Sequence, residues 1–158
     1  MSRTILVLLI AVLVSGCRNI EVGKALEITD VQTGWYDAGI VEGQKNKLVP
    51  SISLRLHNIS KDSVNSIQIN AIFRRVGEPQ EWGAHYVMAI PRAGLAPGAT
   101  SRPIVLRSEG GYTGTQSRLN MLQNREFVDA KVEIFARRGS QNWVKLGEQQ
   151  IGRELLTE

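Results

Sequence analysis

Apolar side chains recur at every second position along most of this chain, and that period is the feature that most constrains its fold. Ile52, Leu54 and Leu56 share one face of such a segment, and the residues between them are polar. A period of two is typical of a strand with one buried face, whereas an amphipathic helix repeats every 3.6 residues. The pattern therefore predicts antiparallel strands that each present one face to a core.

The same period recurs in about seven segments, separated by clusters of Gly, Pro, Asn, Asp and Ser that are typical of turns. The expected strands are 25–35, 50–57, 64–76, 84–90, 104–106, 128–137 and 143–151. No Pro/Gly-rich linker divides this region, so the strands predict one all-β domain, an immunoglobulin-like antiparallel β-sandwich. In 84–90 both faces are partly apolar, which leaves the buried face of that strand open.

Two short segments depart from the alternation. Leu119 and Leu122 are three residues apart, the spacing of one helical face, which predicts a short helix at 117–124 that caps one end of the sandwich. The glycine-rich stretch 110–114 that precedes it is expected to be a loop.

Part of the strand pattern resembles a known group of domains. One expected strand ends in Asn58 followed by Ser60, the next ends in the aromatic Phe73, and a Leu-Ala-Pro-Gly turn at 95–98 precedes a further strand. This succession, over residues 50–106, resembles small bacterial extracytoplasmic domains with an immunoglobulin-like sandwich, including the FxLYD-like group. The resemblance implies the sandwich fold and a structural or partner-binding role, and it carries over no catalytic activity.

The first 17 residues have the organisation of an export signal. Arg3 supplies a positive charge, and residues 5–14 are an uninterrupted apolar run. A helix of this length spans about 15 Å, half of the hydrocarbon core of a bilayer, so the run is too short for a stable transmembrane anchor. It ends in Val-Ser-Gly-Cys at 14–17. These residues resemble the lipobox of bacterial lipoproteins, in which small residues before the cysteine allow the lipoprotein signal peptidase to cut.

The lipobox resemblance implies cleavage between Gly16 and Cys17, attachment of diacylglycerol to the Cys17 thiol and acylation of the new amino group. Two or three acyl chains anchor a protein stably in a membrane, whereas one is marginal. The expected organisation is a signal peptide at 1–16, a lipidated polar tether at 17–25 and the β-sandwich domain at 26–158. In Gram-negative lipoproteins an Asp after the cysteine favours retention in the inner membrane. Because Arg18 stands there, the resemblance favours the outer membrane, facing the periplasm.

The net charge of +4 does not indicate a nucleic-acid partner. Without Arg3 the chain has 18 Lys and Arg against 15 Asp and Glu, a net of +3, and the basic residues come singly or in pairs. A surface that follows nucleic-acid phosphates usually needs a dense basic cluster with aromatic side chains beside it. A solvated surface with a few additional arginines is the better interpretation.

Residues that could carry catalysis or bind a metal are sparse. One cysteine and two histidines exclude a disulfide framework and a Cys/His zinc cluster. His57 and His85 are expected on strands, and Ser60 and Asp62 lie close to His57 in sequence, without the Gly-x-Ser-x-Gly elbow that exposes a nucleophile. We therefore expect no enzyme, no cofactor and no metal site.

Aromatic side chains are the candidates for partner contact. Trp35, Tyr36 and Tyr112 are expected at strand ends or in loops, where an aromatic ring either plugs the end of the sandwich or forms a binding surface. Plugging is the favoured alternative for this group. Phe135 falls on the charged face of its strand. If exposed, it would contact a partner, but a packed helix would equally cover it.

Together these patterns predict a membrane-anchored lipoprotein of the cell envelope. Its sandwich is expected to be a non-catalytic binding or assembly module for another envelope protein, for example through an edge strand to which the partner adds a strand. An alternative is binding of an anionic envelope polymer or lipid, because 13 Arg against 6 Lys suit phosphate and carboxylate groups. An envelope hydrolase that uses His57 or His85 is the least favoured hypothesis.

Overall fold

The computed structural model of the chain describes residues 19–157. The predicted export signal, the cleavage position at Gly16 and the lipidation of Cys17 lie outside the described residues and stay predictions.

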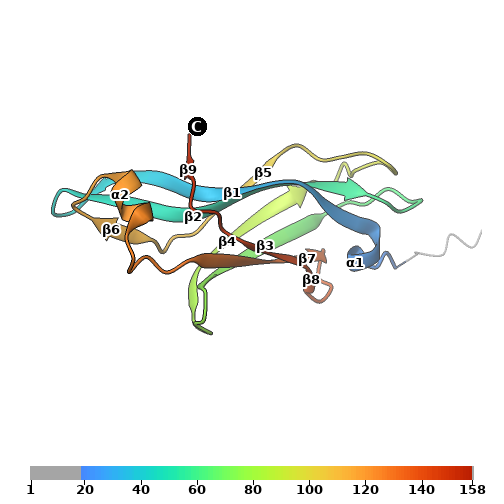
Figure 1. Cartoon of the computed structure of the whole chain (residues 1–158). Helices are drawn as coiled ribbons and strands as arrows, with labels where there is room; N and C mark the ends of the chain where they lie inside the picture. The colour runs from blue at the N-terminus through green and yellow to red at the C-terminus, as the bar shows by residue number, and fades with distance from the viewer. Residues whose placement is uncertain (1–18, 158) are drawn as a thin grey trace, which may run out of the picture.

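The described chain folds into two stacked β-sheets with a short helix at each end (Figure 1). In chain order the elements are α1 (Val22–Ala25), β1 (Leu26–Val41), β2 (Lys45–Asn58), β3 (Ile67–Arg75), β4 (Glu81–Ile90), β5 (Ile104–Arg107), β6 (Tyr112–Gly114), α2 (Arg118–Gln123), β7 (Ala130–Arg138), β8 (Val144–Gln150) and β9 (Leu155–Leu156).

The strand pairing confirms the expected all-β sandwich. The first sheet has the order β5-β2-β1-β9, and β6 pairs with the same edge of β2 as β5 does. The second sheet has the order β4-β3-β7-β8. All neighbouring strands are antiparallel except β1 and β9, which run parallel at Trp35 and Tyr36. Each of the seven expected strands is present.

Two further strands were not expected. β6 lies within the glycine-rich stretch that we expected to be a loop, and it pairs with residues 46–48 of β2. β9 adds two residues to the outer side of β1. Both strands are held by pairing with distant segments, which a local sequence pattern does not report.

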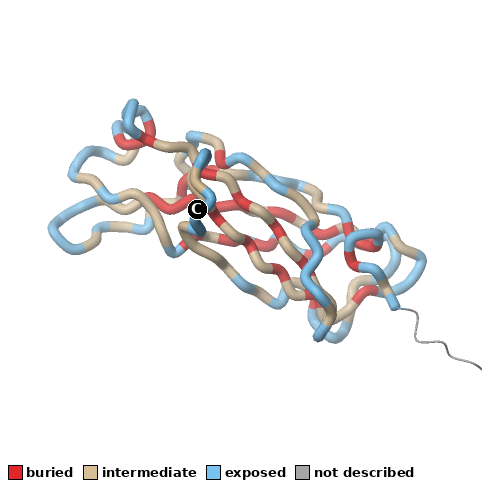
Figure 2. The backbone as a smooth tube through the Cα atoms, turned by 90° about the horizontal axis from the view of Figure 1, so that it is seen from below, coloured by how far each residue is buried: buried red, intermediate tan, exposed pale blue. Residues whose placement is uncertain are grey.

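Alternate residues of β2, β3 and β7 are buried between the sheets and form the core, and Figure 2 shows in red where buried residues lie along the backbone. Ile52, Leu54 and Leu56 of β2 are fully buried, as are Ile69 and Phe73 of β3. The period of two therefore selects the buried face, as expected for strands of a sandwich.

The structure also decides which face of β4 is buried. Val87 and Ala89 pack against the core, whereas Tyr86 and Met88 are 52% and 54% exposed. A register shift near the end of β4 then returns Ile90 to the core. This bulge explains why Ile90 is buried although it alternates in sequence with the exposed Tyr86 and Met88.

The helix expected at 117–124 is confirmed as α2. Ser117 stands at its N-cap, and its hydroxyl accepts a hydrogen bond from the backbone N–H of Asn120 at 3.3 Å. Ser is a favourable residue at this position because it satisfies a backbone donor of the first helical turn.

The second helix, α1, corrects the expected polar tether. Val22 and Ala25 are buried in the core, and the N–H of Ala25 donates to the main-chain oxygen of Glu21 at 3.0 Å. A single turn is too short to show a helical period in the sequence. Ile20 also packs against the core, so the folded part of the chain begins before residue 26 and includes residues 20–25.

Asn58 explains the motif that carries the FxLYD-like resemblance. This side chain is buried, and its amide nitrogen donates to the main-chain oxygens of Asp62 and Leu95, both at 2.9 Å. Its amide oxygen accepts from the N–H of Ser60 at 3.0 Å. Since a buried polar group needs such partners, the motif residues join two turns and serve the fold.

Candidate partner-binding surface

The prediction that Trp35 could contact a partner is wrong, because the side chain of Trp35 is fully buried. Its ring meets Phe127 edge-on at a centroid distance of 4.6 Å, and it is tilted against Tyr112 at 5.7 Å and Trp82 at 6.1 Å. We name these four residues the core aromatic cluster. The ring therefore plugs the sandwich, which is one of the two alternatives that the sequence left open.

Tyr112 and Tyr36 are half-buried and have partners within the fold. The Tyr112 hydroxyl donates to the main-chain oxygen of Val128 at 3.0 Å and accepts from its N–H at 3.2 Å. The Tyr112 ring also lines a groove of about 370 Å³ beside α2. The guanidinium carbon of Arg107 lies 3.4 Å from the centre of the Tyr36 ring and covers it. Structural roles account for both tyrosines.

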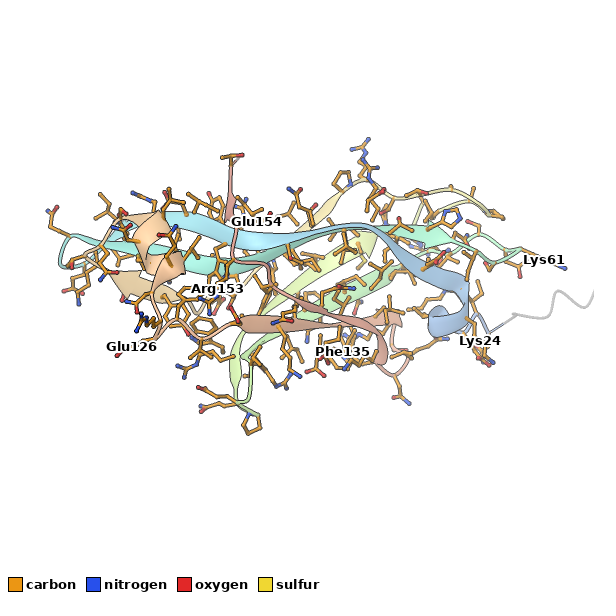
Figure 3. The ribbon with its side chains drawn as sticks, viewed as in Figure 1. Lys24, Lys61, Glu126, Phe135, Arg153 and Glu154 are labelled. Carbon is orange, nitrogen blue, oxygen red and sulfur yellow. The ribbon has the colours of Figure 1, made fainter. Side chains whose placement is uncertain are left out.

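Phe135 lies on the outer face of the second sheet, the face that points away from the core (labelled in Figure 3). The strand register places it beside Asn70 of β3, and Asn70 in turn lies beside Tyr86 of β4. The helices α1 and α2 lie at the ends of the sandwich rather than over this face (Figure 1). The half-buried Phe135 and the exposed Tyr86 are therefore accessible from the same side.

A second row of side chains crosses the same outer face. Gln68 lies between Met88 and Arg137, and the Arg137 Nε donates to the Gln68 Oε1 at 2.6 Å. The guanidinium carbon of Arg137 is 4.5 Å from the centre of the Trp143 ring, and that ring meets Tyr86 edge-on at 6.2 Å. Trp143 is 37% exposed. We name Tyr86, Met88, Phe135 and Trp143 the outer-face cluster.

The outer-face cluster borders an unpaired sheet edge. β4 is the terminal strand of its sheet, and no residue from 82 to 90 carries a charge. Its pairing with β3 is regular from Gly83 to Met88, between two register shifts. Exposed edge strands tend to bind other strands, and most proteins protect them with charges, prolines, bulges or shortness. Residues 86–88 of β4 have none of these protections, whereas the segment 107–110 lies against Gly83 and His85 towards the start of the strand.

The other sheet edges differ from β4 in this respect. β8 carries the exposed charges of Lys145 and Glu148, and a register shift opposite Phe135 interrupts its pairing. β5 has four residues and follows Pro103, and β9 has two residues. β1 carries the exposed charges of Glu27 and Asp30. Among the described strands, β4 therefore has the edge best suited to pairing with another chain.

Ion pairs occupy the rest of the outer face. Glu133 pairs with Arg74 and with Lys145, whose Nζ lies 2.8 Å from a Glu133 oxygen and 2.8 Å from a Glu148 oxygen. The hydrogen bond from Lys145, helped by the charges of Arg74 and Lys145, holds the pKa of Glu133 below its usual value, although partial burial opposes this. The same carboxylates raise the pKa of Lys145. The outer face thus has a charged half and an aromatic half.

The histidines are engaged separately, on different sheets. His57 Nδ1 lies 3.0 Å from the Thr100 hydroxyl, and His85 Nδ1 accepts the N–H of Arg107 at 2.9 Å. The Ser60 hydroxyl donates to the amide oxygen of the neighbouring Asn58 at 2.7 Å. Within residues 19–157, no three His, Cys, Asp or Glu side chains gather as a metal site would require.

Neither helix in the described part of the chain is long and apolar enough to cross a membrane.

Sequence reasoning did not select Tyr86 and Met88 as candidate contacts. Apolar residues stand on both sides of β4, so the alternation did not tell which side chains face the solvent. The absence of charge from 82 to 90 is the one sequence signal that could have pointed to this strand, because a solvated edge strand normally carries charges.

No family model matches the chain, and no curated protein matches it either. A similar solved structure is described as the crystal structure of a protein from Archaeoglobus fulgidus. It is 14% identical, with a TM-score of 0.40, and the alignment covers 82% of this chain and 100% of that chain. The resemblances to bacterial lipoproteins and to FxLYD-like domains stay predictions.

Proposed function

We propose that this chain is an envelope lipoprotein, anchored through a lipid on Cys17, whose sandwich is a non-catalytic binding module for another envelope protein. The observation that carries the binding role is the β4 edge: a regular, uncharged, unpaired strand flanked by the exposed side chains of Tyr86 and Met88. The anchor rests on the lipobox at 14–17 and on the apolar run before it.

Binding would proceed by strand addition. An extended segment of the partner lies along β4, and its backbone N–H and C=O groups pair with the unpaired groups of that edge. Main-chain hydrogen bonds provide affinity, and side chains on the outer face provide specificity. Tyr86, Trp143 and Met88 offer a ring pair and a flexible thioether to alternate side chains of the added strand.

The alternative role, binding of an anionic polymer or lipid through arginines, receives less support. Arg74, Arg118 and Arg153 pair with carboxylates, and Arg137 and Arg138 donate to side-chain amides. Guanidinium groups held in such contacts are less available to a ligand than free ones, since the ligand must displace the present partner.

Site-specific photo-crosslinking in cells that produce the full chain tests the binding role. A photoreactive amino acid in place of Met88 is expected to give one discrete crosslinked product with an envelope protein. The matched control places the same group at Ile40, which is 67% exposed and lies on β1 of the other sheet. Equal product patterns at the two positions, or no product at Met88, would overturn the proposal.

A charge on the edge provides a second measurement. Met88→Lys introduces the type of residue that protects natural edge strands, so it is expected to abolish copurification of the crosslinked protein. Ile40→Lys adds the same charge elsewhere and is expected to leave copurification unchanged. Both side chains are exposed, so neither variant should lose the fold, which thermal unfolding will verify.

The anchor has its own test. Cys17→Ser removes the only thiol of the chain, so the variant is expected to lose the mass of the acyl groups and to leave the membrane fraction. A wild-type chain whose Cys17 carries no lipid when analysed by mass spectrometry would remove the lipoprotein assignment, whatever the crosslinking shows.

A further inference from the structure

The distance between Cys17 and the folded domain is short. Because Ile20 packs against the core and α1 follows at Val22, only residues 18 and 19 separate the cysteine from the fold. The three residue steps from Cys17 to Ile20 span at most about 11 Å when fully extended. A lipid on Cys17, on which this inference rests, would therefore hold the α1 end of the domain close to the bilayer.

Two turns, at residues 60–62 and 141–144, lie beside α1 at this end of the molecule. The N–H of Ile59 donates to the main-chain oxygen of Ala25 at 2.9 Å. A groove of about 360 Å³ lies between residues 19–25 and the turn at 60–62, and one of about 620 Å³ lies between residues 19–24 and the turn at 141–144. α1 and these two turns thus form one continuous end surface.

The end surface combines an exposed apolar side chain with exposed lysines. Ile59 is 54% exposed, and Lys24 and Lys61 are exposed at the same end (labelled in Figure 3). Lys24 forms an ion pair with Glu21 at 2.7 Å, and Asp62 adds a second acidic side chain beside Lys61. Apolar residues that enter the headgroup region and lysines that meet anionic lipid are typical of a surface lying on a membrane.

We propose that this end surface docks on the bilayer that holds the anchor, with Ile59 among the lipid headgroups and Lys61 against anionic phosphates. The lipid then fixes the orientation of the domain as well as its location. α2 lies at the opposite end of the sandwich (Figure 1), so it is directed away from the membrane, and the β4 edge lies on a flank that a partner in the aqueous compartment can reach.

Environment-sensitive labelling of the lipidated full chain tests this orientation. Ile59→Cys and Leu119→Cys each add one reactive thiol, because the native cysteine is blocked by lipid. Leu119 of α2 is 58% exposed and serves as the control at the far end. Each labelled protein is reconstituted into phosphatidylcholine vesicles with and without phosphatidylglycerol, and quenching of the label by lipids with brominated acyl chains is measured.

We expect severalfold stronger quenching at position 59 than at position 119. Lys61→Glu should weaken the quenching at 59 in vesicles that contain phosphatidylglycerol and have little effect without it, whereas Lys45→Glu on β2 should change neither. Equal quenching at 59 and 119 on a lipidated chain would overturn the docking and leave the anchor intact. An unlipidated Cys17 would overturn both proposals, and the mass of the chain distinguishes these outcomes.

Discussion

The molecule has two groups of aromatic rings, one in the core and one on the outer face, and both contain the same kinds of ring contact. In the core aromatic cluster the Trp35 and Phe127 rings meet edge-on at 4.6 Å, and in the outer-face cluster Tyr86 and Trp143 meet edge-on at 6.2 Å. An arginine lies over a ring in each, since Arg153 covers Phe127 and Arg137 covers Trp143. Ring geometry alone therefore does not separate a structural cluster from a binding surface.

The two clusters differ in what covers them. The core cluster lies between the sheets, so burial of its rings stabilises the sandwich. The outer-face cluster has one sheet beneath it, and Tyr86 remains about half exposed. A partner that covers this cluster would bury apolar surface that is exposed in the free domain, and this burial would favour binding. Substitutions in the first cluster should therefore reduce stability, and substitutions in the second should reduce binding.

The largest expected effect is that of Trp35→Ala. Removing a fully buried tryptophan side chain should lower the free energy of unfolding by about 3–5 kcal/mol, because its neighbours Tyr112 and Phe127 cannot close the cavity. Urea denaturation followed by circular dichroism measures the loss. Trp143→Ala is the matched control and should cost less than about 1.5 kcal/mol, the range of an exposed aromatic pair. Equal losses would erase the distinction between the clusters.

Tyr112→Phe should have the next largest effect, about 1–2 kcal/mol. The phenolic hydroxyl both donates to and accepts from the backbone of Val128, so its removal leaves a partly buried N–H and C=O without that partner. Tyr86→Phe removes a hydroxyl from an exposed ring and should leave the unfolding midpoint unchanged. If Tyr86→Phe lowered the unfolding midpoint as much as Tyr112→Phe does, the outer face would be as closely packed as the core.

The alternation of apolar residues was sufficient to predict the sandwich and seven of its strands. Side chains such as Ile52 and Leu54 report the buried face of their strand within a few residues. The short strands β6 and β9 and the single turn of α1 were not predicted. They depend on contacts with segments far away in the sequence, and two to four residues show no period.

The candidate surface was harder to predict than the fold. Whether an aromatic ring such as Trp35 or Trp143 is covered depends on which sheet lies above its strand, and no local pattern encodes that. The uncharged stretch of β4 becomes informative only once the strand order places β4 at an edge. Phe135 was predicted to be a contact if no helix covered it, and it does lie on the uncovered outer face.

A double-mutant cycle on Tyr86 and Trp143 measures how much the outer-face rings contribute to the fold. Tyr86→Ala, Trp143→Ala and the double variant should give a coupling energy of about 0.5 kcal/mol, at the low end for aromatic pairs because both rings are solvated. The same variants should remove the crosslink expected at Met88. Coupling well above 1.5 kcal/mol would make this pair a structural element and weaken the case for a binding surface.

A similarly small effect is expected in the charged half of the outer face, and this effect depends on pH. Glu133→Gln should lower stability near neutral pH by less than about 1 kcal/mol, as for other solvated ion pairs. The pKa of Glu133 is lowered in the folded protein, chiefly by the hydrogen bond from Lys145. Its contribution to stability is therefore present above the usual carboxyl pKa and is lost as the pH falls through the lowered value.

The difference in stability between wild type and Glu133→Gln should shrink in acid, whereas the loss of stability in Trp35→Ala should not, because the deleted ring carries no titrating group. Urea titrations at neutral and acidic pH measure both. A wild-type to Glu133→Gln difference that grows in acid would show that the carboxyl is stabilised in its protonated form and that the ion pairs beside the outer-face cluster do not hold it.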